Sequence, residues 1–216
     1  MTEVETVRAA LHLVELLGVA VFAVSGALMA AEKRMDPFGF AVLGTVTAIG
    51  GGTLRDLVIG VQPVFWVGQP DYLIVSVLVS VGMFWLARLV GPLHRALLWS
   101  DALGMALFTA TGTQKALASG APAVVAVAMG VMTAAFGGIL RDALAGEKPM
   151  MFHNEVYATA ALVGASAQVA LFSFGASSVA SAWFAFLLTF AVRGCALGFG
   201  WRVPSYGDLP RIVRKK

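Results

Sequence analysis

The stretch from Val156 to Val192 contains no charged residue, and this places the strongest limit on what the chain can fold into. A helix crosses the hydrocarbon core of a bilayer with about 20 apolar residues, so this stretch is too long for a single crossing. Its middle part, 173–178, is made of serine, glycine, alanine and phenylalanine, and we expect a turn there between two spans. Of all 216 residues, 59% are hydrophobic and 12% are charged. A water-soluble domain of this size could not bury so much apolar surface, and such a chain is not disordered.

The same length argument, applied along the whole chain, predicts an all-α polytopic membrane protein with seven transmembrane helices in a single membrane domain, 1–216. The expected spans are about 11–31, 38–60, 72–90, 96–118, 122–145, 156–172 and 178–199. Short segments with charges, proline or glycine separate most of them, as is usual for membrane helices joined by brief loops.

The distribution of lysine and arginine predicts the orientation. If the N-terminus is outside, the inside segments carry Lys33, Arg34, Arg88, Arg95, Arg141, Lys148, Arg202, Arg211, Arg214, Lys215 and Lys216, and the outside segments carry only Arg8, Arg55 and Lys115. Loops rich in lysine and arginine stay in the cytoplasm. We therefore expect an outside N-terminus and a basic cytoplasmic tail at 200–216. The net charge of +3 is explained by the basic residues that flank the spans, and it does not indicate a nucleic-acid partner.

The chain contains an internal repeat with a shift of 86 residues. Residues 44–63 align without a gap with residues 130–149, and ten of the aligned positions are identical. These are Gly44, Thr47, Ala48, Gly51, Gly52, Leu54, Arg55, Asp56, Gly60 and Pro63 with their counterparts. Each copy would hold three spans, about 11–91 and 96–173. Because three is odd, the second copy would enter the membrane upside down, with the helix at 178–199 outside the repeat.

Glycines recur at the same place in both copies. The second span contains Gly50, Gly51 and Gly52, and the fifth contains Gly137 and Gly138. Consecutive glycines are poor helix formers, so we expect a break or kink in each span. Broken helices at equivalent places in inverted repeats indicate a permeation or binding site, whereas tight helix packing is the alternative use of small residues.

An arginine and an aspartate follow the glycines in both copies: Arg55 with Asp56, and Arg141 with Asp142. A charge inside a span is costly unless it is paired or hydrated. Neighbours in sequence do not face each other on a helix, so we expect pairing across the repeats, Arg55 with Asp142 and Arg141 with Asp56. These residues would line the wall or gate of a polar pathway, or else fix the fold as ion pairs at helix ends.

Further polar residues repeat on the first and fourth spans. Ser25 corresponds to Thr111, and both are candidate pathway residues. Glu15 corresponds to Asp101. Inversion would put these two acids near opposite faces of the membrane, where they could attract cations to each mouth. Helix N-capping is the alternative role for acids at the start of a span.

Other classes of chemistry have little support. Cys195 is the only cysteine, so the chain forms no internal disulfide and no cysteine metal cluster. The three histidines show no metal-ligand spacing, and no Ser-His-Asp set or phosphate-binding loop is present. We therefore expect no enzyme activity, no metal and no cofactor.

The run from Phe22 to Ala27 and the two Gly-Gly-x-Leu-Arg-Asp segments ending at Asp56 and Asp142 resemble the bacterial branch of the trimeric intracellular cation channel family. So does the stretch from Asp101 to Ala116. The resemblance, which extends over about 11–199, implies a homotrimer in the inner (plasma) membrane. It also implies a pore for potassium and sodium in each subunit, shaped by the glycines of the second and fifth spans.

Two functions remain open at this stage. The first is a passive channel for monovalent cations, which the repeat, the glycines and the resemblance favour. The second is a secondary transporter of a small zwitterion such as glycine, whose carboxylate and ammonium groups would bind at half-helix ends. A structural membrane protein is a third class, and buried arginine and aspartate residues argue against it.

Overall fold

The structure, a computed structural model, describes residues 3–152 and 156–203, with side chains from residue 12 onward. The described part of the chain forms eight α-helices. They are α1 (Glu3–Glu32), α2 (Pro37–Ile59), α3 (Phe65–Gly68), α4 (Asp71–Leu86), α5 (Leu93–Ala118), α6 (Ala123–Leu144), α7 (Ala158–Ser173) and α8 (Ser178–Phe199). Short 3₁₀ turns follow α4 at Ala87–Leu89 and precede α7 at Met150–Phe152. Most of the expected basic tail, 204–216, lies outside the described residues.

Seven of these helices coincide with the seven expected spans, and only the four-residue α3 lies between them. Among the described residues, five helices are long and apolar enough to cross a membrane: α1, α2, α4, α6 and α8. Helix α5 is long enough but carries several charged and polar residues, and α7 has only 16 residues. The all-helical membrane fold is confirmed, and the count of seven crossings stays a prediction.

Local sequence signals explain the helix ends. At the start of α2, the Asp36 side chain accepts a hydrogen bond from the Gly39 N–H at 2.8 Å, and Pro37 occupies the first helical position. These are the residue types that start a helix most readily. Helix α2 ends at Gly60, whose φ of 74° is the left-handed conformation that glycine adopts without strain. Helix α8 is bounded in the same way by Ser177 and Gly200.

The two repeats pack against each other with reciprocal contacts. A Cβ on Gly51 would overlap the backbone oxygen of Thr133, and a Cβ on Gly137 would overlap that of Thr47. Since 51 corresponds to 137 and 47 to 133, each helix makes the same contact with the other. The residue numbers run in opposite directions along the crossing, so α2 and α6 are antiparallel. The sequence repeat leads us to expect this geometry of an inverted pair.

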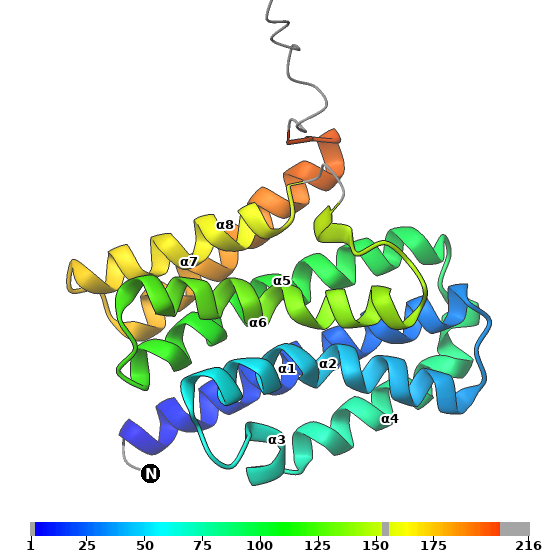
Figure 1. Ribbon diagram of the computed structural model, residues 1–216, viewed down its shortest axis with the longest axis horizontal. Coiled ribbons are helices and arrows are strands. Elements are labelled where there is room, and N and C mark those ends of the chain that lie inside the picture. Colours follow the sequence, from blue (N-terminus) through cyan, green and yellow to red (C-terminus); the bar gives the residue numbers. More distant parts are fainter. Residues whose placement is uncertain (1–2, 153–155, 204–216) are drawn as a thin grey trace, which may run out of the picture.

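Helices α1 and α5 form a second reciprocal crossing. The Phe22 ring occupies the space where a Cβ on Gly104 would lie, and the Phe108 ring is 3.4 Å from the Cβ position of Gly18. The two rings pack together with centroids 5.1 Å apart. Helices α1, α2, α5 and α6 thus form the centre of the bundle, with α4 on one side and α7 and α8 on the other (Figure 1).

The expected breaks at the glycines are not present. Helix α2 continues without interruption through Gly50, Gly51 and Gly52, and α6 does so through Gly137 and Gly138. The glycines instead bring two helix backbones into direct contact, which is the packing role of small residues in membrane helices. Both helices stay continuous across their glycines, and the missing side chains let the two backbones approach each other.

Candidate functional site

Two clusters of charged side chains lie near opposite ends of the α2–α6 crossing. We call Glu15, Arg55, Asp56, Tyr72 and Lys115 the Arg55 cluster, and Ser25, Asp101, Arg141, Asp142 and Tyr157 the Arg141 cluster. Burying charges among apolar helices is costly unless they are paired. The partners of each charged side chain in these clusters are therefore described one by one.

The first cluster is built around an ion pair between sequence neighbours. Arg55 Nε donates to Asp56 Oδ1 at 2.8 Å, and the other carboxylate oxygen, Asp56 Oδ2, accepts the backbone N–H of Phe65 at 2.9 Å. The Arg55 guanidinium also lies 5.7 Å from the centroid of the Phe65 ring. The segment after α2 therefore folds back and holds the carboxylate in place.

The second cluster repeats this arrangement. Arg141 Nε donates to Asp142 Oδ1 at 2.8 Å, and Asp142 Oδ2 accepts the backbone N–H of Met150 at 2.9 Å. The arginine–aspartate bonds of the two repeats are thus equivalent, and the backbone N–H that binds each aspartate comes from nearly the same place, nine residues after Asp56 and eight residues after Asp142.

The prediction of cross-repeat pairs, Arg55 with Asp142 and Arg141 with Asp56, is wrong. Each arginine pairs with the aspartate that follows it in sequence. Neighbouring Cβ atoms on a helix do point in different directions, but the flexible arginine side chain can turn back toward the next residue. The backbone N–H that binds each aspartate fixes that carboxylate as the target.

The Arg141 cluster is buried and tightly packed. Arg141 Nη1 donates to Asp101 Oδ1 and to Ser25 Oγ, both at 2.6 Å. The side chains of Arg141 and Asp101 are 0% exposed. One carboxylate oxygen, Asp101 Oδ2, has no hydrogen-bond partner within the described part of the chain. The ring of Tyr157, another member of the cluster, lies 5.1 Å from the guanidinium of Arg193 on α8.

The Arg55 cluster is more open. Its acid, Glu15, is 3.8 Å from Arg55 and 19% exposed, and it accepts a hydrogen bond from the Tyr72 hydroxyl at 2.8 Å. A second cation joins it, because Lys115 Nζ lies 3.3 Å from Asp56 Oδ2 with 26% of its side chain exposed. Glu15 and Asp101 thus take corresponding places in the two clusters, as the repeat predicts, but with different surroundings.

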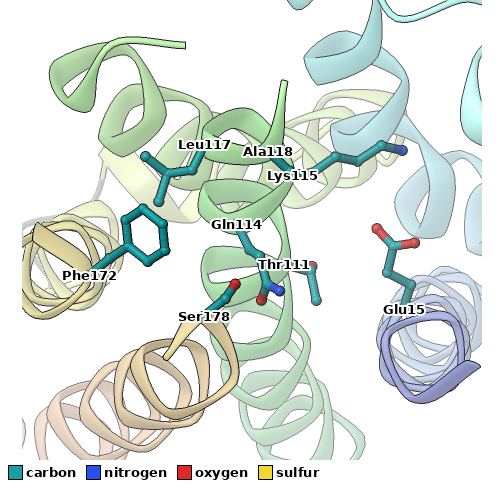
Figure 2. A pocket seen from close by; sticks show the side chains of 8 residues that line it. All are labelled: Glu15, Thr111, Gln114, Lys115, Leu117, Ala118, Phe172 and Ser178. Atoms are coloured by element: carbon teal, nitrogen blue, oxygen red, sulfur yellow. The ribbon is translucent and has the colours of Figure 1, made fainter. Parts of the chain in front are cut away.

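A cavity of about 350 Å³ adjoins the Arg55 cluster. Figure 2 shows Glu15 on α1 facing Thr111 and Lys115 on α5, with Ser178 at the start of α8 on the other side. Gln114 also lines the cavity, and its buried Oε1 has no hydrogen-bond partner in the described residues. Ser25, which corresponds to Thr111 in the other repeat, is hydrogen-bonded to Arg141.

The remaining candidate residues have packing roles in this structure. The Cβ positions of Gly50, Gly52 and Gly138 lie within 2.8 Å of side chains of Leu140, Phe65 and Tyr157 respectively. The glycines are therefore close to both clusters without contributing polar atoms. Within the described part of the chain, no group of three histidine, cysteine, aspartate or glutamate side chains could hold a metal ion.

Sequence reasoning missed several members of the two clusters. Lys115 enters the sequence analysis only as a charge that orients the chain, and the tyrosines Tyr72 and Tyr157 do not enter it. Lys115 could have been found, since it is a charge near the end of the fourth predicted span, one helical turn beyond Thr111. The tyrosines gave no signal, because an aromatic residue near a span end is usually an interfacial anchor.

A family model and several membrane proteins match most of this chain. A family model described as "Glycine transporter" matches residues 12–88 and 98–173, which are nearly the two repeats. A UPF0126 membrane protein of Vibrio cholerae is 40% identical over 201 residues, covering 91% of this chain and 82% of the relative. The UPF0126 inner membrane protein YadS of Escherichia coli is 40% identical over 194 residues, covering 89% and 94%.

Solved structures of cation channels share the fold. The orthologue of the TRIC trimeric intracellular cation channel from Rhodobacter sphaeroides has a TM-score of 0.86 and 47% identity, covering 89% of this chain and 99% of that one. A second solved structure, described as the structural basis for conductance through TRIC cation channels, has a TM-score of 0.82 and 31% identity. The match covers 90% of this chain and 96% of that one. The relatives are thus named as membrane proteins, and those with solved structures as cation channels.

Proposed function

Because this chain belongs to the trimeric intracellular cation channel family, in the branch whose members are also named UPF0126 and glycine transporter, we propose that it is a passive channel for monovalent cations. The expected ions are potassium and sodium. The pathway runs within each subunit between α1, α2, α5 and α6, from the cavity at Glu15 toward the Arg141 cluster.

One observation carries this proposal: fully buried charges lie on the central helices of an apolar bundle, at both ends of the α2–α6 crossing. Arg55, Asp56, Arg141 and Asp142 are at most 1% exposed as whole residues. Such charges are rare in membrane helices, and when present they mark ion or substrate pathways. An apolar core of the same size would stabilise the bundle without them.

The charges also account for a preference for cations. Glu15 adds a partly exposed carboxylate beside the cavity, and Asp101 adds a buried carboxylate with an oxygen that has no partner in the described residues. Acidic groups at a narrow entrance raise the local concentration of cations and repel anions. Lys115 also lines the cavity, and its ammonium is the group that a substrate carboxylate would meet if the protein were the zwitterion transporter.

The pathway is asymmetric in this conformation. The cavity gives access to the Arg55 cluster, whereas in the Arg141 cluster the arginine occupies the corresponding space by bonding to Ser25 and Asp101. We assign the Arg141 cluster as the closed gate and the Arg55 cluster as the open entrance. Conduction then requires Arg141 to leave Ser25 and Asp101 while it keeps Asp142 as its partner.

The wider arrangement follows from the same proposal. Seven helices cross the inner membrane as two inverted three-helix repeats plus α8, with the N-terminus outside and the C-terminus in the cytoplasm. The Arg55 cluster then faces the outside and the Arg141 cluster the cytoplasm. Three subunits assemble into a homotrimer, each with its own pathway, as the name of the Rhodobacter orthologue indicates for that protein.

The function is tested with purified protein in liposomes. Planar-bilayer recordings in a potassium gradient should give discrete single-channel currents whose reversal potential favours K⁺ over Cl⁻. Uptake of labelled glycine is measured on the same preparation. Saturable glycine uptake without discrete currents would overturn the channel and favour the transporter.

A matched pair of variants links the currents to the proposed entrance. Glu15→Gln removes the carboxylate beside the cavity and should reduce both the conductance at low salt and the preference for K⁺ over Cl⁻. Glu32→Gln removes the same charge at the other end of α1, away from both clusters, and should leave the preference unchanged. Equal effects of the two substitutions would contradict the assigned entrance.

A further inference from the structure

A row of hydrogen bonds leads from the carboxylate beside the cavity to the start of α4. The Tyr72 hydroxyl, which donates to Glu15 Oε2 at 2.8 Å, also lies 2.9 Å from His12 Nδ1. The other ring nitrogen, His12 Nε2, lies 2.6 Å from Asp71 Oδ2. We call Glu15, Tyr72, His12 and Asp71 the His12 network. It joins a side chain that lines the cavity to a histidine outside the Arg55 cluster.

The hydrogen atoms of the His12 network follow from counting donors. An ionised carboxylate only accepts, so the bond to Asp71 needs a hydrogen on Nε2 of His12. The single hydrogen of the Tyr72 hydroxyl goes to Glu15 for the same reason. The Tyr72 oxygen can then only accept, so Nδ1 of His12 also carries a hydrogen. Both ring nitrogens are donors only in the imidazolium form, and the three bonds therefore exist together only when His12 is protonated.

Loss of this proton would break the network at Tyr72. A neutral ring keeps one hydrogen, and the carboxylate of Asp71 retains it on Nε2 of His12. Nδ1 then becomes an acceptor and competes with Glu15 for the one hydroxyl hydrogen of Tyr72. A positive charge also disappears from the neighbourhood of Glu15. Both changes make the carboxylate beside the cavity more attractive to a cation.

Histidine is the member of the His12 network that titrates near neutral pH. The titratable and charged side chains around this network are Glu15 on α1, Arg55 and Asp56 on α2, Asp71 and Tyr72 on α4, and Lys115 on α5. Of these residue types, none has its ordinary pKa between pH 5 and 8, whereas that of histidine lies there. The side chains of His12 and Asp71 are 30% and 44% exposed, so protons from water can reach the pair.

We propose that His12 is a positioning residue for the entrance, which holds Glu15 through Tyr72 and adjusts by its proton how strongly the entrance attracts cations. This inference rests on the proposed channel function. As the pH rises through the range in which histidine loses its proton, the conductance at low salt and the preference for K⁺ over Cl⁻ should increase. One unit charge about 7 Å from an ion in water changes the local ion concentration about two- to threefold, and we expect a change of this size.

The protonation state is tested by NMR, without reference to ion currents. In the full-length protein, His94→Gln with His153→Gln leaves His12 as the only histidine. The chemical shifts of its two labelled ring nitrogens should show the imidazolium form at pH 5.5 and a neutral ring at high pH with the hydrogen on Nε2. A ring that is neutral at pH 5.5 would overturn the proposal, whether or not the protein conducts ions.

The consequence for the entrance is tested by bilayer recordings at low salt between pH 5.5 and pH 8. The wild type should show the two- to threefold rise, and His12→Gln should abolish it. His94→Gln is the matched control, because His94 also faces an acid, Glu32 at 3.5 Å, but at the other end of α1. This variant should keep the rise. A full rise in His12→Gln, or no rise in a conducting wild type, would overturn the role of His12 and leave the channel function intact.

The part played by the tyrosine is separated by Tyr72→Phe, which removes only the hydroxyl. The charge on His12 still changes in this variant, but its link to Glu15 is lost, so the rise with pH should be smaller than in the wild type. An unchanged rise would overturn positioning through Tyr72. If the wild type gives no discrete currents at any pH, the proposed channel function fails, and the NMR titration still decides whether His12 is protonated in its network.

Discussion

The Arg55 and Arg141 clusters are built from the same repeated motif, yet one is open and the other is sealed. Arg141 lies 2.6 Å from Asp101, and both side chains are 0% exposed. Arg55 lies 3.8 Å from the corresponding acid, Glu15, which is 19% exposed and adjoins a cavity. The arginine–aspartate pair within each motif is the same in both. The motif therefore fixes where the charges are held, and the residues around it decide how far the charged side chains are exposed.

The two repeats have different residues at two positions that bear on this difference in exposure. Lys115 supplies a second cation to the Arg55 cluster, where the aligned position in the other repeat is Met29. Thr111 lines the cavity, whereas the aligned Ser25 is bonded to Arg141. Near the Arg141 cluster a further cation comes instead from α8, which lies outside the repeat. Under the proposed function, the entrance and the gate are two differently surrounded copies of one repeated motif.

The largest effect should come from removing the two arginines. Arg141→Met leaves Asp101 and Asp142 buried without their cation, and a stranded dry charge costs about 3–5 kcal/mol. Arg55→Met should cost clearly less, because Lys115 already contacts Asp56 and Glu15 is partly exposed. Chemical unfolding of both variants in the same detergent measures the difference. Equal losses would show that the two clusters are equally dry.

The next effect concerns the hydroxyls at corresponding positions. Ser25→Ala removes a buried acceptor of the Arg141 guanidinium, which should cost about 1.5–3 kcal/mol. Thr111→Val removes only a hydroxyl that donates to the Leu107 backbone oxygen and borders the cavity, so its cost should be smaller. Thermal unfolding midpoints order the two variants. A larger loss for Thr111→Val would reverse the proposed assignment of gate and entrance.

Substitutions of the glycines at the α2–α6 crossing should destabilise the protein to a similar extent in both repeats. A Cβ in Gly51→Ala or Gly137→Ala would meet the backbone of the facing helix, and overpacking of this kind costs about 1–3 kcal/mol. The two losses should be similar because the contacts are reciprocal. Gly82→Ala is the control, since nothing lies within 4 Å of its Cβ position. If all three variants lose the same free energy of unfolding, the glycines at the crossing have no special packing role.

The smallest effect on stability is expected for Glu15→Gln. The carboxylate is partly exposed and its distance from Arg55 is long for an ion pair, so its loss should cost under about 1 kcal/mol. Asp101→Asn at the corresponding position should cost more, because it weakens a buried pair with Arg141. The comparison needs only unfolding midpoints of the two variants. A more stable Asp101→Asn variant would contradict the account of the sealed cluster.

The sequence was sufficient for the positions of the helices and for the residues of the motif. Apolar length and capping residues mark the helices, and the identical positions of the repeat mark Arg55 and Arg141. The ion-pair partners could not be predicted from helix geometry alone. Asp56 and Asp142 are held by backbone N–H groups of Phe65 and Met150, which belong to segments after the helices.

The expected helix breaks at the glycines are wrong for a related reason, and the structure shows the alternative use of these residues, tight packing. In an isolated helix, consecutive glycines weaken the backbone, and this led us to expect breaks. In the bundle, Gly51 and Gly137 face the backbone of the opposite helix, and the crossing keeps both helices continuous. The sequence of one helix does not reveal which neighbour approaches it, so the choice between break and close contact needed the structure.

The central claim, an open entrance at the Arg55 cluster and a closed gate at the Arg141 cluster, can be tested with the chain's only cysteine removed. In a Cys195→Ala background, Thr111→Cys and Ser25→Cys are exposed to a cationic, water-soluble thiol reagent in liposomes, while K⁺ currents are recorded. Thr111→Cys should react readily and lose current, whereas Ser25→Cys should be protected while the channel is closed. A Ser25→Cys variant that reacts as fast as Thr111→Cys, or a modified Thr111→Cys variant with unchanged current, would contradict the claim.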